Sequence, residues 1–334
     1  MDSLPIIALT MGDPAGVGPE IIVKAFQDDT LSLQARVVVI GDSKWLKSTA
    51  KEYAPEISIH AIGRPDESRY QKCTIDVIDL ENVPEGIAVG QPSIEAGQAS
   101  YEAIKTAVDL AVKGEVSAIT TAPINKQSLN LAGHSFPGHT ELLADLTKSK
   151  ESLLMMTGNS MRVVLVTTHV PLEMIKLLLT TEKISNTIRM TNEWLKKHVA
   201  NIPSIAVTGL NPHCGDGGIF GEEETELILP ALKKVQAEGI QASGPFPADA
   251  LFGRTNWPNY DAVVCMYHDQ GMIPIKMDSK GQGVNITLGL PILRTSVDHG
   301  TAFDIVGKGE ACPENLKIAL RMAVKLTQST LSMR

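Results

Sequence analysis

The sequence predicts an α/β protein built on a largely parallel or mixed sheet with helices on both faces. Two patterns lead to this expectation. Short runs rich in β-branched residues alternate along the chain with amphipathic segments, as strands alternate with crossover helices. Several runs, such as VVVI, VVLV and AVVC, are apolar at every position, which is typical of strands buried on both sides of a sheet.

Nine strands are expected from these runs. They are Ile6–Thr10, Arg36–Ile40, Ile75–Leu80, Ser117–Thr121, Leu153–Thr157, Val163–Thr168, Ser204–Gly209, Ala262–Tyr267 and Val284–Leu288. Two segments, 93–113 and 182–199, have apolar residues at helical spacing and predict long helices. His198, beside two lysines in the second helix, is expected at the surface. The Gly-, His- and Pro-rich stretch 126–150 is expected to cross between two lobes that share a cleft.

Composition argues against several classes of protein. The chain has 334 residues and is 43% hydrophobic, which is enough for a sizeable core. Its net charge of −8 and its small number of aromatic residues do not suit a nucleic-acid binder. No apolar run approaches the roughly 18–20 residues that span a bilayer, and the first ten residues do not resemble a secretory signal. The four cysteines are widely spaced, as thiols of a reducing compartment are. We therefore expect a cytoplasmic protein without nucleic-acid or membrane partners.

Three histidines follow predicted buried strands by zero to four residues. They are His169 after VVLVTT, His213 after IAVTGLNP and His268 after AVVCMY. The carboxyl ends of strands form the binding crevice of open α/β sheets, so these side chains are expected to converge. Three neutral imidazoles with one open position make a Lewis-acidic metal site. Cys265 is expected to be a core thiol, whereas the role of Cys214 stays open.

Other polar residues mark loops that face a ligand. His139 and Thr140, in PGHTELLA, are expected at the start of a helix that faces the cleft. His299, in DHGTAFD, is expected in a second helix-start loop. The Gly-rich segment 12–20, GDPAGVGPE, follows the first strand and is expected to open a helix. It contains neither the G-x-G-x-x-G fingerprint nor the GK[ST] of a P-loop.

A cluster of cations lies near the last predicted strand. Lys276, Lys280 and Arg294 surround Asn285 in the sequence, on either side of a Gly-rich turn. Such a cluster suits a phosphate or a carboxylate. The alternative is an ordinary solvated loop.

Six motifs in order along the chain carry a family resemblance. MGDPAGVGPE, PGHTE, TTHVP, NPHCGDGG, MYHDQG and GVNITLGLPILRTSVDHGTAFD run from residue 11 to 304, and with them the chain resembles the 4-hydroxythreonine-4-phosphate dehydrogenase family. That family is similar to the isopropylmalate and isocitrate dehydrogenases, whose HGSAPDIAGKG-type loop resembles 299–309, with Phe303 in place of proline. The resemblance implies an isopropylmalate dehydrogenase-like fold with the active site between two lobes, 1–132 with 303–334 and 133–302. The second lobe would carry the metal ligands and the dimer interface.

The resemblance also implies an activity and its residues. It implies a homodimer with shared active sites, and NAD- or NADP-linked oxidative decarboxylation of a small 4-phosphorylated hydroxy acid, as in pyridoxine biosynthesis. One divalent metal per subunit, zinc, cobalt, magnesium or manganese, would be bound by His169, His213 and His268. The implied substrate contacts are His139, Thr140, Lys276, Asn285 and Arg294. The implied cofactor contacts are His299, Gly300, Thr301 and Asp304. Asp249, in GPFPADALF, matches an aspartate near the substrate, and the proton acceptor could be His139, Asp249 or a metal-bound water.

Two alternatives to this reading remain. Relatives act on 4-phosphooxy-L-threonine, on D-threonate or D-erythronate 4-phosphate, or on aromatic cis-dihydrodiols. The polar stretch MDSKGQG favours a phosphorylated acid over a dihydrodiol. A zinc hydrolase with three histidine ligands is less consistent with the sequence, because there is no HExxH motif.

Overall fold

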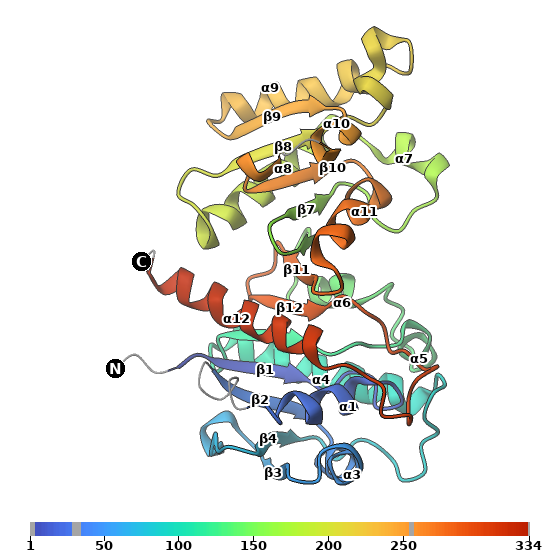
Figure 1. Ribbon diagram of the computed structural model, residues 1–334, viewed down its shortest axis with the longest axis vertical. Coiled ribbons are helices and arrows are strands. Elements are labelled where there is room, and N and C mark those ends of the chain that lie inside the picture. Colours follow the sequence, from blue (N-terminus) through green and yellow to red (C-terminus); the bar gives the residue numbers. More distant parts are fainter. Residues whose placement is uncertain (1–3, 29–34, 254–256, 333–334) are drawn as a thin grey trace. The chain divides into compact units, whose positions relative to one another are not determined.

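The computed structural model describes residues 4–28, 35–253 and 257–332. Contacts divide the chain into two compact units, each an α/β unit in its own right (Figure 1). Unit 1 combines residues up to 152 with residues 290–331, and unit 2 comprises residues 153–289. Among the described residues, no helix is long and apolar enough to cross a membrane.

The described strands of unit 1 form a parallel sheet in the order β3-β4-β2-β1-β5-β12. Their bounds are β1 Ile6–Thr10, β2 Arg36–Gly41, β3 Ser58–Ile62, β4 Thr74–Asp79, β5 Ala118–Thr121 and β12 Arg294–Val297. In the register, Ala8 of β1 lies opposite Val38 of β2 and Ile119 of β5. The parallel pairing explains why the strands are apolar on both faces.

Helices cover both faces of this sheet. They are α1 Gly18–Ala25, α3 Ser43–Tyr53, η1 Pro65–Glu67, α4 Ile94–Val112, α5 Lys126–Leu131, α6 His139–Leu146 and α12 Glu314–Ser332. Ile7 and Leu9 of β1 pack in one core with residues of α1, α3 and α12, whereas Ala8 points to a second core with α4, α5 and α6. Capping side chains fix several helix starts. Ser93, for example, accepts a hydrogen bond from the Ala96 amide at 3.1 Å at the start of α4.

The described strands of unit 2 form a mixed sheet in the order β11-β6-β7-β10-β8-β9. Their bounds are β6 Leu153–Thr157, β7 Arg162–Leu165, β8 Ser204–Thr208, β9 Gln241–Phe246, β10 Ala262–Cys265 and β11 Val284–Leu288. The β11-β6 and β6-β7 pairs are antiparallel, and the remaining pairs are parallel. The predicted parallel or mixed sheet is therefore confirmed.

The helical segments of unit 2 place its functional loops. They are α7 Leu172–Leu178, α8 Thr181–His198, η2 Pro212–Gly218, η3 Glu224–Ile228, α9 Leu229–Ala237, α10 Ala248–Gly253, η4 Trp257–Asn259 and α11 His268–Ser279. α11 packs closely on β7, because a Cβ atom on Gly271 would lie 2.4 Å from the Val163 side chain. Met272 and Ile275 bury the same helix face against β7 and β10. This packing fixes the start of α11, where His268 stands.

All nine predicted strands and both long helices are confirmed, with small shifts at their ends. Three strands were not predicted: β3, β9 and β12. β7 ends at Leu165, so His169 lies in a loop rather than at the end of a strand. After Leu165 the run VVLVTTH continues as a bend, in which Thr167 Oγ1 donates to the Met266 carbonyl at 2.7 Å.

Two local expectations about histidines are wrong. His198 is 8% exposed and its ring lies 4.7 Å from the Trp194 ring, so it packs inward at the end of α8. His299 does not lead into a helix, because turns follow it and α12 begins only at Glu314.

Candidate active site

Two of the three predicted ligand histidines meet in unit 2. The rings of His169 and His268 have centroids 5.5 Å apart and an interplanar angle of 45°. Both line one cavity of about 410 Å³, together with residues of the loop before α7 and with Tyr267 and Asp269. An ion about 2.0–2.1 Å from one nitrogen of each ring, in tetrahedral geometry, would put the centroids roughly 5 Å apart. The observed pair fits two ligands of one metal ion.

A carboxylate orients one member of this pair. His268 Nδ1 lies 2.7 Å from Asp269 Oδ1. A carboxylate bound to the far nitrogen of a metal-ligating histidine fixes its tautomer and ring orientation. In this arrangement Nε2 of His268 is the nitrogen available to a metal. Asp269 is not among the site residues predicted from the sequence, although its position next to a candidate ligand could have pointed to it.

The third histidine stands apart from the pair. His213 is exposed on η2, and its ring centroid lies 6.4 Å from that of Phe220. Across the described residues, no group of three His, Cys, Asp or Glu side chains lies close enough to hold a metal ion. The structure therefore brings together His169 and His268 but not the complete predicted set. Gln270 connects the start of α11, which carries His268, to the end of β8, which leads to His213. It accepts a hydrogen bond from Thr208 Oγ1 and donates one to the Gly209 carbonyl, both at 2.7 Å.

Unit 1 contains a buried arginine and a buried histidine ring nitrogen. Arg294, on β12, is 1% exposed. Its Nε and Nη2 donate to Thr121 Oγ1 at 3.2 and 2.8 Å, and that hydroxyl donates to Ser296 Oγ at 2.8 Å. Burial lowers the pKa of Arg294 to about 9. The alternative of a solvated loop does not hold for Arg294, which lies in a buried strand, whereas Lys276 and Lys280 are exposed.

His139 is held neutral beside this cation. It is the first residue of α6, and its Nε2 is buried without a hydrogen-bond partner among the described residues. Burial, and then the charge of Arg294, keep the pKa of His139 well below its usual range. Thr140 follows it in the first turn and is half-buried. A neutral imidazole thus feels the charge of a buried guanidinium, an arrangement that suits a ligand that is anionic and releases a proton.

The loop of the predicted cofactor contacts, 299–304, packs against the turn 12–20 within unit 1. The Val17 amide donates to the Thr301 carbonyl at 3.0 Å, and a Cβ on Gly16 would lie 2.9 Å from Thr301 Cβ. Thr301 is therefore a packing residue, only 7% exposed. The neighbouring predicted contacts are all exposed: His299, Gly300 and Asp304.

The chain that follows the 299–304 loop is anchored at Gly309 and Ala311. Lys24 Nζ bonds to Glu20 Oε1 at 2.6 Å and to the carbonyls of Gly309 and Ala311 at 2.7 and 3.0 Å. The Ala311 amide donates to the same Glu20 oxygen at 3.1 Å. The buried end of α1 therefore fixes the loop that leads into α12.

The other predicted site residues lie on separate elements of unit 2. Lys276 is exposed on α11, and Asn285 is half-buried on β11. Asp249 is exposed on α10 and lines a cavity of about 830 Å³ with Trp257. This larger cavity and the histidine cavity have Tyr267 and Asp269 in common.

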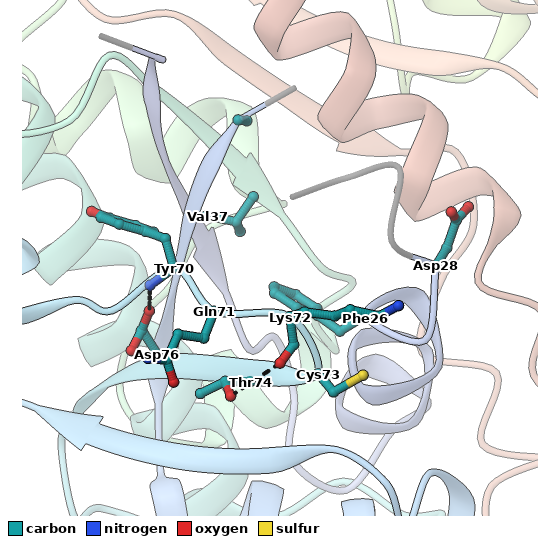
Figure 2. A pocket seen from close by; sticks show the side chains of 10 residues that line it. Phe26, Asp28, Val37, Tyr70, Gln71, Lys72, Cys73, Thr74 and Asp76 are labelled. Atoms are coloured by element: carbon teal, nitrogen blue, oxygen red, sulfur yellow. Dashed lines mark hydrogen bonds between the residues drawn. The ribbon is translucent and has the colours of Figure 1, made fainter. Parts of the chain in front are cut away.

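A third hollow lies in unit 1, between α1 and the start of β4 (Figure 2). Phe26, Tyr70, Cys73 and Asp76 are among the residues that line it, and the Tyr70 amide donates to Asp76 Oδ2 at 2.8 Å. Its volume of about 30 Å³ suits a water molecule and is far too small for a nucleotide. It is not a candidate for the cofactor.

Comparisons with known proteins agree over nearly the whole chain. A family model described as pyridoxal phosphate biosynthetic protein PdxA matches residues 33–323. A 4-hydroxythreonine-4-phosphate dehydrogenase of Desulforapulum autotrophicum is 46% identical over 324 residues, covering 96% of this chain and 95% of that protein. A D-threonate 4-phosphate dehydrogenase of Cupriavidus necator is 45% identical over 326 residues, covering 97% of this chain and 98% of that protein.

Solved structures give the same picture. The crystal structure of a 4-hydroxythreonine-4-phosphate dehydrogenase from Klebsiella pneumoniae matches with a TM-score of 0.90 at 41% identity, over 97% of this chain and 98% of that one. An isocitrate dehydrogenase from Methylococcus capsulatus matches with a TM-score of 0.50 at 13% identity, over 98% of this chain and 87% of that one. The second likeness concerns the fold alone, and it agrees with the predicted fold class.

Proposed function

The chain belongs to the family of the pyridoxal phosphate biosynthetic protein PdxA, and from this premise we propose that it is an NAD- or NADP-linked dehydrogenase. It oxidises the CH–OH group of a small 4-phosphorylated hydroxy acid, which then loses a carboxylate as CO₂. The candidate substrates are 4-phosphooxy-L-threonine and D-threonate or D-erythronate 4-phosphate. The names of the relatives support both kinds of substrate.

The buried cation of unit 1 is the observation that carries the proposal. Arg294 holds a positive charge out of water beside the neutral ring of His139. Charge-assisted hydrogen bonds to a phosphate are strongest in such a dry site. Thr140, Lys276 and Asn285 are the further substrate contacts of the proposal.

The ligands proposed for the divalent metal are His169, His213 and His268. The geometry of the His169–His268 pair supports two of them. Bound there, zinc, cobalt, magnesium or manganese would supply Lewis-acid polarisation of the hydroxyl being oxidised and of the carboxylate being lost. Asp269 orients His268, so its ring presents Nε2.

Two residues of the chain are candidates to accept the hydroxyl proton. The Nε2 atom of His139 is unpartnered among the described residues and neutral, which suits a general base. Asp249 is exposed to the cavity that it lines and is the second candidate. The nicotinamide, which accepts the hydride, is assigned to the loop of His299, Gly300, Thr301 and Asp304, which is anchored at both ends.

We expect a cytoplasmic homodimer, with its interface on unit 2. Large apolar side chains there are exposed by 60–75%: Leu172, Leu177, Ile219, Ile273 and Met277. Three of them border the two cavities, so a second copy of the chain would cover apolar surface beside the site. All four cysteines are free, which supports a reducing compartment. Ile273→Glu should give a monomer in light scattering, whereas Val112→Glu, at an equally exposed apolar position of unit 1, should not.

One experiment tests the activity. NADH and NADPH formation is measured with 4-phosphooxy-L-threonine, D-threonate 4-phosphate, D-erythronate 4-phosphate and an aromatic cis-dihydrodiol, each with several divalent metals. Turnover of one phosphorylated acid, with CO₂ released in equal amount, is expected. Turnover of the dihydrodiol alone would replace the proposed substrate class. Hydrolysis without nucleotide reduction would favour a zinc hydrolase.

A further inference from the structure

The turn that carries His213 has an unusual backbone. Six consecutive residues, His213 to Gly218, have positive φ angles. Three are not glycine: His213 at 53°, Cys214 at 53° and Asp216 at 44°. L-residues rarely adopt this left-handed region, and they remain there only when the surrounding structure holds them.

A buried carboxylate holds the start of this turn. Glu224 Oε1 accepts hydrogen bonds from the amides of Leu210 and Asn211, both at 2.7 Å. Glu224 Oε2 accepts from Asn211 Nδ2 at 2.9 Å. Glu224 is 3% exposed and begins the π-helical turn η3, so its position is fixed by the helix that follows. Three donors thus fix the backbone two to three residues before His213.

The neighbouring carboxylate ties the turn to the loop of another candidate ligand. Glu223, 5% exposed, accepts from Asn211 Nδ2 at 2.7 Å. Its other oxygen, Oε1, lies 2.5 Å from Nζ of Lys176 on α7, the helix that follows the His169 loop. Asn211 therefore contacts both carboxylates, and Glu223 joins two of the segments that carry candidate ligands.

Packing leaves the turn little freedom to relax. A Cβ on Gly215 would lie 2.6 Å from the Gly221 carbonyl and 3.0 Å from Glu224 Oε2. A Cβ on Gly209 would lie 2.7 Å from the Cys214 sulfur. The Cys214 sulfur therefore packs against Gly209, whereas the His213 side chain is exposed.

We propose that Asn211, Glu223 and Glu224 are positioning residues, which hold the left-handed turn and so present the His213 imidazole for metal binding. This inference rests on the proposed function, in which His213 is a ligand. The three residues touch neither substrate nor metal in this proposal. They act through His213, and their loss should weaken metal binding while the histidines stay in place.

The test measures metal affinity on the whole protein. Zn²⁺ and Co²⁺ are titrated into the chelator-treated enzyme against a chromophoric competitor, and NADH affinity is measured by fluorescence. Glu224→Gln places an amide donor opposite Asn211, and Asn211→Ala removes the bridging amide. Each should weaken metal binding by about 10–100-fold, as removal of outer-shell partners does. NADH affinity should stay as in wild type, and excess metal should restore kcat. Glu222→Gln, an exposed glutamate of the same run, is the matched control and should behave as wild type.

The outcomes separate this inference from the proposed function. Wild-type metal affinity in Asn211→Ala would overturn it, even if Glu224→Gln failed to fold. Loss of NADH affinity together with metal affinity would also overturn it, because a general structural role would then explain the result. If the wild-type enzyme bound no metal and His213→Ala changed nothing, the metal of the proposed function would be wrong, and the positioning role with it.

Discussion

Replacing Arg294 with methionine separates the binding role of this side chain from its effect on stability. Methionine has a comparable length and no charge, so the strand packing of β12 is largely kept. The bond of Thr121 to Ser296 remains available after the substitution. The variant should lose activity on a phosphorylated substrate without the usual loss of stability seen for buried substitutions.

Both magnitudes follow from burial. A charge-assisted hydrogen bond to phosphate contributes about 1.5–3 kcal/mol, so kcat/KM should fall roughly 10- to 150-fold. Burial lowers the pKa of Arg294 from 12.5 to about 9, so the charged form costs a few kcal/mol at neutral pH. The folded pKa is the lower one, so this cost is present below about pH 9 and disappears as the pH rises toward 12.5. The methionine variant has no buried charge and therefore no such cost at pH 7. Its free energy of unfolding should be at least that of wild type.

Steady-state kinetics and urea unfolding at pH 7 give the two measurements. The same kinetics with the dephosphorylated analogue should show a much smaller loss, because the phosphate is absent. Equal losses with both substrates would mean that Arg294 binds the carboxylate or shapes the site. A variant destabilised by about 2 kcal/mol or more would refute the burial argument, since the guanidinium would then be a net stabiliser.

Three further outcomes follow from contacts described above. His268→Ala should abolish turnover and lower metal content, measured by atomic absorption, while the melting temperature changes little, because the residue is partly exposed. Hydrogen bonding to Lys176 lowers the pKa of Glu223 to about 2, so this pair stabilises the fold above about pH 4.5 and loses its effect as the pH falls toward 2. The stability difference between wild type and Lys176→Met should therefore shrink over that range in urea titrations. Gly16→Ala should displace Thr301 and weaken NADH binding in a fluorescence titration.

Each of these outcomes has a matched control. His60→Ala removes a partly exposed histidine of unit 1 and should leave metal content unchanged. Lys233→Met removes a lysine of α9. Its difference from wild type in unfolding free energy should not change as the pH falls from about 4.5 toward 2. Gly253→Ala meets nothing within 4 Å and should bind NADH as wild type does. Unchanged NADH affinity in Gly16→Ala would show that packing of the 12–20 turn against Thr301 does not position the cofactor loop.

The sequence predicted the fold well where the chain is apolar on both faces. β1, β2 and β10 were predicted because apolar runs such as VVVI and AVVC, bounded by polar residues, are typical of buried strands. β12 was missed because Arg294, Thr295 and Ser296 are polar, although they bond to Thr121 and Thr120 of β5 inside the sheet. β9 was missed because it contains Gly244 and Pro245, which interrupt a strand pattern.

The sequence pointed to candidate site residues, but it did not show which of them lie close together in the structure. The motifs identified the family, which the comparisons confirm, and they selected His169 and His268, which the structure brings together. Glu224 is one of three consecutive glutamates, a pattern that normally indicates a solvated surface, so the sequence does not point to its buried role. Its carboxylate is buried against the amides of Leu210 and Asn211, a contact across 13 to 14 residues of sequence that a local pattern does not reveal.

The order in which the chain is synthesised matters for a fold whose first unit is completed by its last residues. Unit 2 can close once residue 289 has emerged, but β5 gains its β12 partner, and one face of the first sheet gains α12, only at the end. At about 5–20 residues per second, residues 153–332 take roughly 10–40 s to make. Throughout that interval β5 is an open strand edge beside an uncovered apolar face, the kind of surface that chaperones bind. Unit 2 is thus complete in sequence before unit 1, and the amino-terminal half of the nascent chain exposes an apolar face until β12 and α12 have been made.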